Sequence, residues 1–177
     1  MVKNENIYIK DACIIIDLFD LEIFHIFLQI DAVIIVTQAV AREITDINQK
    51  ALLEKHINSK DIVLRPDGDI HDIKALTDKY RGISYSDATA LDAALKTNGT
   101  LLSADGLLRK ACKNEGGDIY GSLWVICQLV ELGFISVSEA VAKTNTLMVI
   151  NPRTPKQLCK KIIKEFEAKT ATYHTNK

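Results

Sequence analysis

Thr100-Leu101-Leu102-Ser103-Ala104-Asp105 is a short apolar run that ends at an aspartate, and Gly106 follows it. A second run of this kind, Ile7-Tyr8-Ile9-Lys10, ends at Asp11. Open α/β sheets bind their ligands in the loops at the carboxyl ends of parallel strands. The two runs therefore predict strands of such a sheet, with both aspartates at its functional edge.

Helix-length amphipathic segments alternate with further short apolar runs. Strands are expected at 32–36, 61–65 and 118–120 as well as at the two runs above. Helical segments are expected at 12–30, 37–58, 69–80, 85–97, 106–114, 122–132, 137–148 and 155–168. Repeated strand-helix-strand order predicts an α/β fold of three layers, α/β/α, in which helices cover a central, mostly parallel sheet and extra helices follow at the C-terminus.

Two of the helices carry clear end signals. Ser84 and Asp87 fit a capping box at the start of the segment 85–97, and Asn98-Gly99 fits a left-handed C-terminal cap. Thr154 and Pro155 fit the N-cap and first position of the last helix. These bounds are the sharpest that the sequence predicts.

Length and composition favour one globular domain. The chain has 177 residues, of which 47% are apolar and 25% charged, which is ordinary for a domain with a sizeable core. We expect a single domain over 1–168, with its core at about 7–121, a helical extension at 122–168 and a flexible tail at 169–177. Acidic residues interrupt the most apolar region, so no membrane span is expected. The polar start, 1–6, leaves no room for a secretory signal, which predicts a cytoplasmic location.

Several classes of site are excluded by what the sequence lacks. The four cysteines form no CxxC pair and have no histidines at zinc-ligand spacing, so we expect reduced thiols in the core. Neither GxGxxG nor GxxxxGK[ST] occurs, which argues against a dinucleotide enzyme or a P-loop NTPase. A formal net charge of -1 excludes nucleic-acid binding by bulk positive charge, so a nucleic-acid substrate would require a metal to supply that charge locally.

Four acids are candidates for a metal site, namely Asp11, Glu43, Asp87 and Asp105. Clustered carboxylates repel one another, and a hard divalent cation relieves that repulsion. Mg²⁺ prefers oxygen ligands and keeps several of its waters, and Mn²⁺ accepts similar ligands. Such a site can activate water and stabilise the charge that develops on a phosphodiester.

Three segments together resemble the motifs of PIN domains. Asp11-Ala12-Cys13-Ile14-Ile15-Ile16-Asp17 is similar to the family's D-[TA]-[NS]-x-x-[IL]-D opening, and Ser86-Asp87-Ala88 is similar to its central helix. Leu102-Ser103-Ala104-Asp105 resembles its L-[TS]-x-D segment, and Glu43 falls where the family places its second acid. The resemblance covers about 7–121, in the family's order. The stretch 120–136 is similar to a subset with a longer C-terminal helical part.

The resemblance implies a function. It points to a metal-dependent endoribonuclease of the VapC type, the toxin of a type II toxin-antitoxin pair. It implies that Asp11, Glu43, Asp87 and Asp105 bind Mg²⁺ or Mn²⁺, which activates water to hydrolyse an RNA phosphodiester bond. It also implies an RNA substrate, a small antitoxin protein and a homodimer. Ser103 keeps the hydroxyl that the family has before its last acid.

Other interpretations remain open. Cys13 stands where the family usually has Asn or Ser to orient the acids, and a thiol is a weak hydrogen-bonding group. This departure is compatible with a PIN-like module that binds RNA or protein without catalysis. A haloacid-dehalogenase-like phosphatase or a receiver domain fits the motifs less well. Each acid also has a structural alternative as a cap, turn or solvated residue, and Asp17 and Asp92 are possible substitutes in the cluster.

Overall fold

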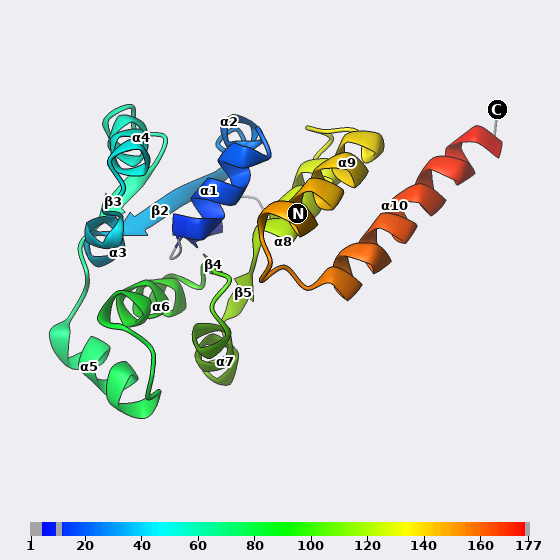
Figure 1. The fold of residues 1–177 in the computed structure, drawn as a ribbon. Helices are drawn as coiled ribbons and strands as arrows, with labels where there is room; N and C mark the ends of the chain where they lie inside the picture. The colour runs from blue at the N-terminus through cyan, green and yellow to red at the C-terminus, as the bar shows by residue number, and fades with distance from the viewer. Residues whose placement is uncertain (1–4, 10–11, 176–177) are drawn as a thin grey trace. The chain divides into compact units, whose positions relative to one another are not determined.

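The computed structural model describes residues 5–9 and 12–175, and gives backbone alone for 5, 6, 8, 12, 13 and 169–175. Five strands of this part of the chain form one sheet in the order β3-β2-β1-β4-β5, and all its pairs are parallel (Figure 1). The strands are β1 (Glu5–Ile9), β2 (Ala32–Thr37), β3 (Val63–Arg65), β4 (Thr100–Leu102) and β5 (Asp118–Tyr120). The predicted α/β class with a parallel sheet is confirmed.

The helices follow the predicted order with some changes of length. They are α1 (Ala12–Asp20), α2 (Phe24–Phe27), α3 (Gln38–Glu43), α4 (Ile47–Asn58), α5 (Ile70–Lys79), α6 (Tyr85–Thr97), α7 (Gly106–Asn114), α8 (Ser122–Glu131), α9 (Val137–Ile150) and α10 (Lys156–Thr175). The last helix begins one residue after the predicted Pro155 and continues past the predicted end at 168.

Two segments predicted as continuous helices are each broken in two. The segment 12–30 is interrupted at Glu22, whose φ of 57° is left-handed and cannot continue a helix. The segment 37–58 is interrupted at Ile44, which has an extended backbone. Asp46 then starts a new helix, because its carboxylate accepts from the backbone N–H groups of Asn48 and Gln49, both at 3.0 Å. Apolar spacing continues across both breaks, so periodicity alone missed them.

The sheet order creates a switch point between β1 and β4. From β1 the chain adds β2 and then β3 on one side, and it later adds β4 and β5 on the other. The last residues of the two central strands, Ile9 and Leu102, lie directly opposite each other. The two strands therefore end at the same level of the same edge, and such a switch point is where open α/β sheets form their sites.

Helix α6 is the most buried helix of the sheet domain. It contacts β1, β2 and β4, and its residues from Ala88 to Ala94 are all buried. Its predicted ends are confirmed, since Ser84 and Asp87 form the capping box and Asn98 adopts a left-handed φ of 51°. Because α6 ends just before β4 begins, it runs antiparallel to the strands, and its length of about 20 Å brings its first turn back to their carboxyl edge.

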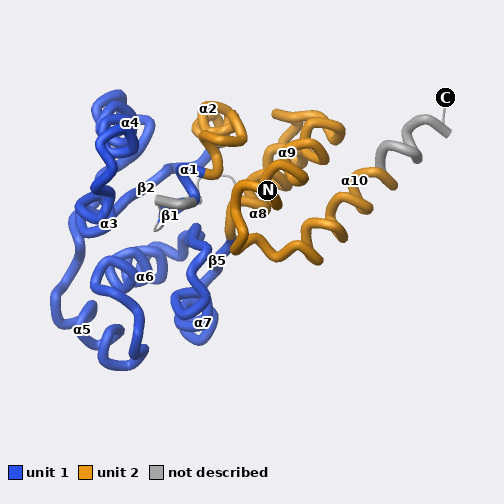
Figure 2. The backbone as a smooth tube through the Cα atoms, in the orientation of Figure 1, with its two compact units in different colours: residues 1–16, 31–120 blue, residues 17–30, 121–177 orange. Residues whose placement is uncertain are grey.

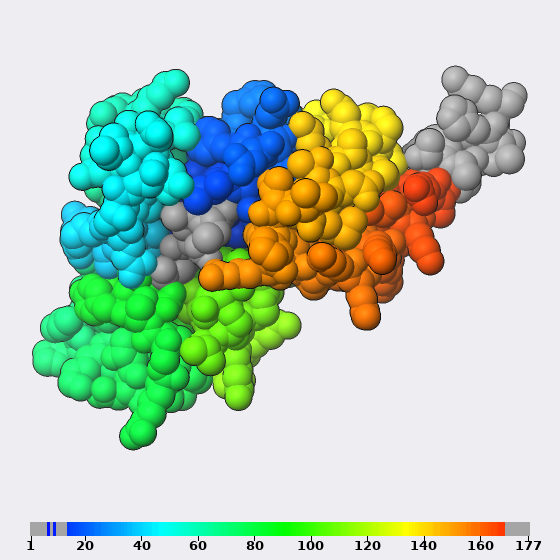
Figure 3. Space-filling view, viewed as in Figure 1, coloured from blue at the N-terminus to red at the C-terminus, as the bar shows by residue number. Residues whose placement is uncertain are grey.

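The described residues fall into two compact units, one from 1–16 and 31–120 and the other from 17–30 and 121–177 (Figure 2). The first unit holds the sheet. In the second, α9 packs against both α8 and α10, and α2 contacts α8. Figure 3 shows side chains of α9 in yellow beside those of α10 in orange. This unit has its own buried apolar residues, including Phe27, Val125, Ile126 and Leu129.

Thr144 of α9 offers a test of packing in the second unit. Its side chain is fully buried, and its hydroxyl has no hydrogen-bond partner among the described residues. Burying an unpaired polar group costs about 1–3 kcal/mol. We expect Thr144→Val, which keeps the shape and removes the hydroxyl, to raise the free energy of unfolding by about 1 kcal/mol in urea titrations followed by circular dichroism. Thr146→Val is the control, because that exposed threonine already donates to the carbonyl of Ala142; a stabilisation equal to that of Thr144→Val would contradict this account.

Two of the cysteines lie in the core as expected. Cys112 is 1% exposed and Cys159 is fully buried. Burial raises the pKa of the Cys112 thiol to about 11, so it stays protonated and unreactive at neutral pH. In the described part of the chain, no helix is both long and apolar enough to cross a membrane.

Candidate active site

Asp105 stands three residues after β4, at the carboxyl edge of the sheet. It is the N-cap of α7, because its Oδ1 accepts from the backbone N–H of Leu108 at 2.8 Å. Its own N–H donates to the hydroxyl of Ser103 at 3.1 Å, and Ser103 is fully buried. The side chain of Asp105 is only partly exposed. The hydroxyl that the sequence singled out therefore shapes the turn that carries Asp105.

Arg109, in the first helical turn of α7, holds the segment at Ser103 from its other side. Its guanidinium donates to the carbonyl of Ser103 and to the carbonyl of Ile119, both at 3.0 Å. Ser103 directly follows β4 and Ile119 is the middle residue of β5, so one cation links the segment after β4 to β5. Arg109 and Lys113 also line a hollow of about 460 Å³ beside β5, together with Asp118.

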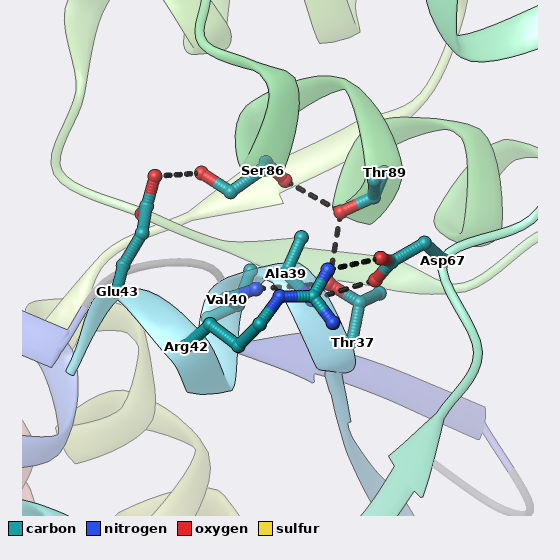
Figure 4. A network of polar contacts seen from close by, with 8 residues as sticks. All are labelled: Thr37, Ala39, Val40, Arg42, Glu43, Asp67, Ser86 and Thr89. Atoms are coloured by element: carbon teal, nitrogen blue, oxygen red, sulfur yellow. Dashed lines mark hydrogen bonds and ion pairs between the residues drawn. The ribbon is translucent and has the colours of Figure 1, made fainter. Parts of the chain in front are cut away.

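Glu43 and Asp87 lie in one hydrogen-bonded network although they come from different helices. Glu43 is the last residue of α3 and is exposed, and its carboxylate accepts from the hydroxyl of Ser86 in the first turn of α6 (Figure 4). The Ser86 hydroxyl lies 2.8 Å from that of Ser84. Ser84 in turn forms the capping box with Asp87, whose Oδ2 accepts from the Ser84 N–H at 2.6 Å. Two of the predicted acids are thus linked through two serines.

Helix α3 is held in place by three further hydrogen bonds. The hydroxyl of Thr37, the last residue of β2, lies 2.9 Å from that of Thr89 in α6. Asp67, which follows β3, accepts from the N–H of Ala39 at 2.6 Å and from Arg42 at 2.5 Å (Figure 4). These contacts fix the direction of α3 and so the position at which Glu43 leaves it.

The remaining predicted site residues cannot be placed in the same way. Asp11 and the side chain of Cys13 lie outside the described residues. The structure relates Glu43 to Asp87 through hydrogen bonds, and it places Asp105 at the carboxyl edge on α7. Among the residues that it describes, no three acid, histidine or cysteine side chains are grouped so that they could hold a metal ion.

Asp17 and Asp92, the two possible substitutes among the metal-binding acids, both form hydrogen bonds with other side chains. Asp17 is 5% exposed and belongs to the second unit, where it accepts from the Ser122 hydroxyl at 2.5 Å and from the Asn151 amide at 2.7 Å. Asp92 lies on α6 and accepts from Lys96 at 2.9 Å. Both side chains are therefore buried, and Asp17 is enclosed by polar groups on α8 and after α9.

Sequence reasoning missed the roles of Ser86 and Asp67. Ser86 is 2% exposed, yet in the sequence it stands out only as the residue before Asp87. The signal available was the series Ser84, Ser86 and Thr89 at the start of a helix whose other buried residues are mostly alanine, because hydroxyls on a buried face need partners. Asp67 gave no such signal, since it lies in an ordinary Pro-Asp-Gly turn.

The fold and these residues define a class of protein. It is a parallel α/β protein with the strand order 3-2-1-4-5 and with acidic side chains at the carboxyl edge, beside the switch point. The chain belongs to the PIN domain family, since the family model DUF3368, described as a PIN domain, matches residues 7–168. PIN domains are typically metal-dependent nucleases.

Other comparisons add little on function. Among solved structures, the chain is similar to one described as a domain of a functionally unknown protein from Methanocaldococcus jannaschii DSM 2661. The two are 22% identical, the match covers 66% of this chain and 90% of the other, and the TM-score is 0.46. No curated protein matches the chain.

Proposed function

We propose that this protein is a divalent-metal-dependent endoribonuclease that uses Asp11, Glu43, Asp87 and Asp105 as its metal-binding acids. The observation that carries the proposal is the network joining Glu43 to Asp87 through Ser86 and Ser84. A hydroxyl that donates to one carboxylate and a cap that orients another hold acids from two helices near each other. Membership of the PIN domain family supports a nuclease over other acid-dependent enzymes.

The donor set fits Mg²⁺ or Mn²⁺. All four candidate side chains offer carboxylate oxygens, the ligands that hard divalent ions prefer, and nitrogen or sulfur ligands are not needed. Mg²⁺ is commonly held by one or two direct carboxylates and reaches others through its waters, so acids from separate elements can share it. When bound, the ion supplies positive charge for the phosphodiester and lowers the pKa of water.

Asp105 and Glu43 have different roles in the proposed site. Asp105 is held by the Leu108 N–H and by the turn at Ser103, so its carboxylate is oriented before any ligand arrives. Glu43 is exposed, so its carboxylate is accessible to a metal ion or to the waters around one. In the proposed reaction, water attacks phosphorus in line and forms a new P–O bond, while the P–O bond to the leaving oxygen breaks. The attacking water loses one proton and the leaving oxygen gains one, so the protons balance.

The wild-type protein is the first test of the proposal. Ligand that binds only the folded state stabilises it by about 2.7 kcal/mol at a hundredfold excess over its dissociation constant. We expect a saturable rise in melting temperature with Mn²⁺ that EDTA reverses, and metal-dependent cleavage of labelled single-stranded RNA on denaturing gels. Absence of both would overturn the proposal, whereas RNA binding without cleavage would favour the non-catalytic module suggested by Cys13.

The resemblance of the motifs to VapC-type proteins supports a narrower proposal. We assign the protein as the toxin of a toxin-antitoxin pair, acting in the cytoplasm as a homodimer that a small antitoxin blocks. Induced expression should then arrest growth of a bacterial host, and the Asp105→Asn variant expressed at the same level should not. Normal growth with an active, abundant wild-type nuclease would rule out the toxin role and leave the nuclease assignment intact.

A further inference from the structure

Ser86 is a buried serine at the centre of the hydrogen-bonded network that joins Glu43 to Asp87. Ser86 is 2% exposed. Its hydroxyl nevertheless contacts the carboxylate of Glu43, an exposed residue. Figure 4 shows the Glu43 side chain reaching across from α3 to meet Ser86 on α6. A flexible, solvent-exposed carboxylate is thus tied to a rigid, buried donor.

The direction of the hydrogen bonds follows from the number of protons available. A carboxylate accepts only, so the single proton of the Ser86 hydroxyl is directed to Glu43. The Ser86 oxygen must then accept from the Ser84 hydroxyl at 2.8 Å. The Ser84 oxygen accepts in turn from the N–H of Asp87 at 3.1 Å. The chain therefore runs one way, from the backbone of Asp87 to the carboxylate of Glu43.

A second chain of hydroxyls holds the backbone of Ser86. The Thr89 hydroxyl donates to the Ser86 carbonyl at 2.8 Å, so it can only accept from the Thr37 hydroxyl at 2.9 Å. Thr37 closes β2 and accepts from the N–H of Val40 at 3.4 Å. Both the side chain and the carbonyl of Ser86 are thus fixed, and the second chain anchors them to the end of a central strand.

We infer that Ser86 is the positioning residue for the metal site, holding the Glu43 carboxylate in the orientation needed to act together with Asp87. The inference rests on the proposed function and adds to it a residue that touches neither metal nor RNA. Partners that orient a metal ligand typically change metal affinity or activity by about tenfold to a hundredfold when they are removed. Without Ser86, Glu43 keeps its charge but loses the hydrogen bond that orients its carboxylate.

The test compares Ser86→Ala with Ser86→Thr and with Ser122→Ala. Ser122 is the matched control, because it is also a buried serine whose hydroxyl donates to a carboxylate, that of Asp17. Binding of Mn²⁺ is measured from the free-ion signal in electron paramagnetic resonance, which needs no substrate. We expect Ser86→Ala to raise the Kd for Mn²⁺ about tenfold or more, Ser86→Thr to restore most of the affinity, and Ser122→Ala to leave it unchanged.

The outcomes separate the inference from the proposed function. If the wild type binds Mn²⁺, Asp105→Asn does not, and Ser86→Ala binds as the wild type does, Ser86 has no positioning role and the nuclease assignment stands. If Ser86→Ala and Ser122→Ala weaken binding equally, the effect is a general loss of stability and the inference fails. A wild type that binds no Mn²⁺ overturns both. Kinetics should show a lower kcat with little change in KM for RNA, since Ser86 does not contact the substrate.

Discussion

Asp105→Asn should abolish stabilisation by Mn²⁺ and metal-dependent RNA cleavage while leaving the metal-free fold almost unchanged. Asparagine caps helices about as well as aspartate, so the bond from the Leu108 N–H to the Asp105 side chain at 2.8 Å can persist. Loss of the negative charge removes a hard oxygen ligand and some repulsion between carboxylates. At a Mn²⁺ concentration about one hundred times its dissociation constant, the free energy of unfolding of the wild type should rise by about 2.7 kcal/mol. That of the variant should not change.

Asp69→Asn provides the matched control for this change. Asp69 is also an N-cap aspartate, whose Oδ1 accepts from the N–H of His71 at 2.7 Å, but it begins α5 and follows the edge strand β3. Its variant should keep the full response to Mn²⁺. Metal affinity equal to that of the wild type in Asp105→Asn, or an unstable apo protein, would show that Asp105 acts only as a helix cap.

Asp17 is a buried acid of the second unit, and here we expect a substitution to destabilise the fold. Asp17→Ala leaves the hydroxyl of Ser122 and the amide of Asn151 without their acceptor at 2.5 and 2.7 Å. Hydrogen bonds to charged groups contribute about 1.5–3 kcal/mol each, and unpaired buried donors add a penalty. We expect the free energy of unfolding to fall by about 3 kcal/mol or more, measured by urea titration with circular dichroism.

Asp20 on the same helix is the control for Asp17. It is exposed, and substitutions at exposed positions usually change stability by no more than about 0.5 kcal/mol. Asp20→Ala should therefore unfold close to the wild type. Equal destabilisation by the two variants would mean that loss of a helix carboxylate, and not of the buried contacts to Ser122 and Asn151, explains the effect at Asp17.

Much of the fold was predictable because its signals are local. A capping box at Ser84 and Asp87, a left-handed cap at Asn98, and short apolar runs between amphipathic segments depend on neighbouring residues alone. These signals located α6, α7 and the succession of strands and helices along the chain. The breaks at Glu22 and Ile44 could not be read this way, because the apolar residues on either side keep a helical spacing and the chain turns to satisfy tertiary packing.

The candidate site was predictable only in part. Asp105 and Ser103 follow a strand directly, and Asp87 follows a capping serine, so the sequence identified them by position. Glu43 has no local motif, and its link to α6 depends on Ser86, a residue 43 positions away in the chain. Asp17 was only a possible substitute in the cluster, because its partners on α8 and after α9 lie far away in the sequence.

The sequence by itself therefore determined the α/β class, the helix caps and the acids that follow strands, since each rests on interactions within a few residues. The tertiary structure alone decided which acids share hydrogen bonds. Glu43 meets Ser86 because α3, which follows β2, packs against α6. Asp17 is enclosed by residues more than 100 positions away. Such pairings depend on which elements pack side by side, and packing is a property of the whole sheet and its helices rather than of any short stretch of sequence.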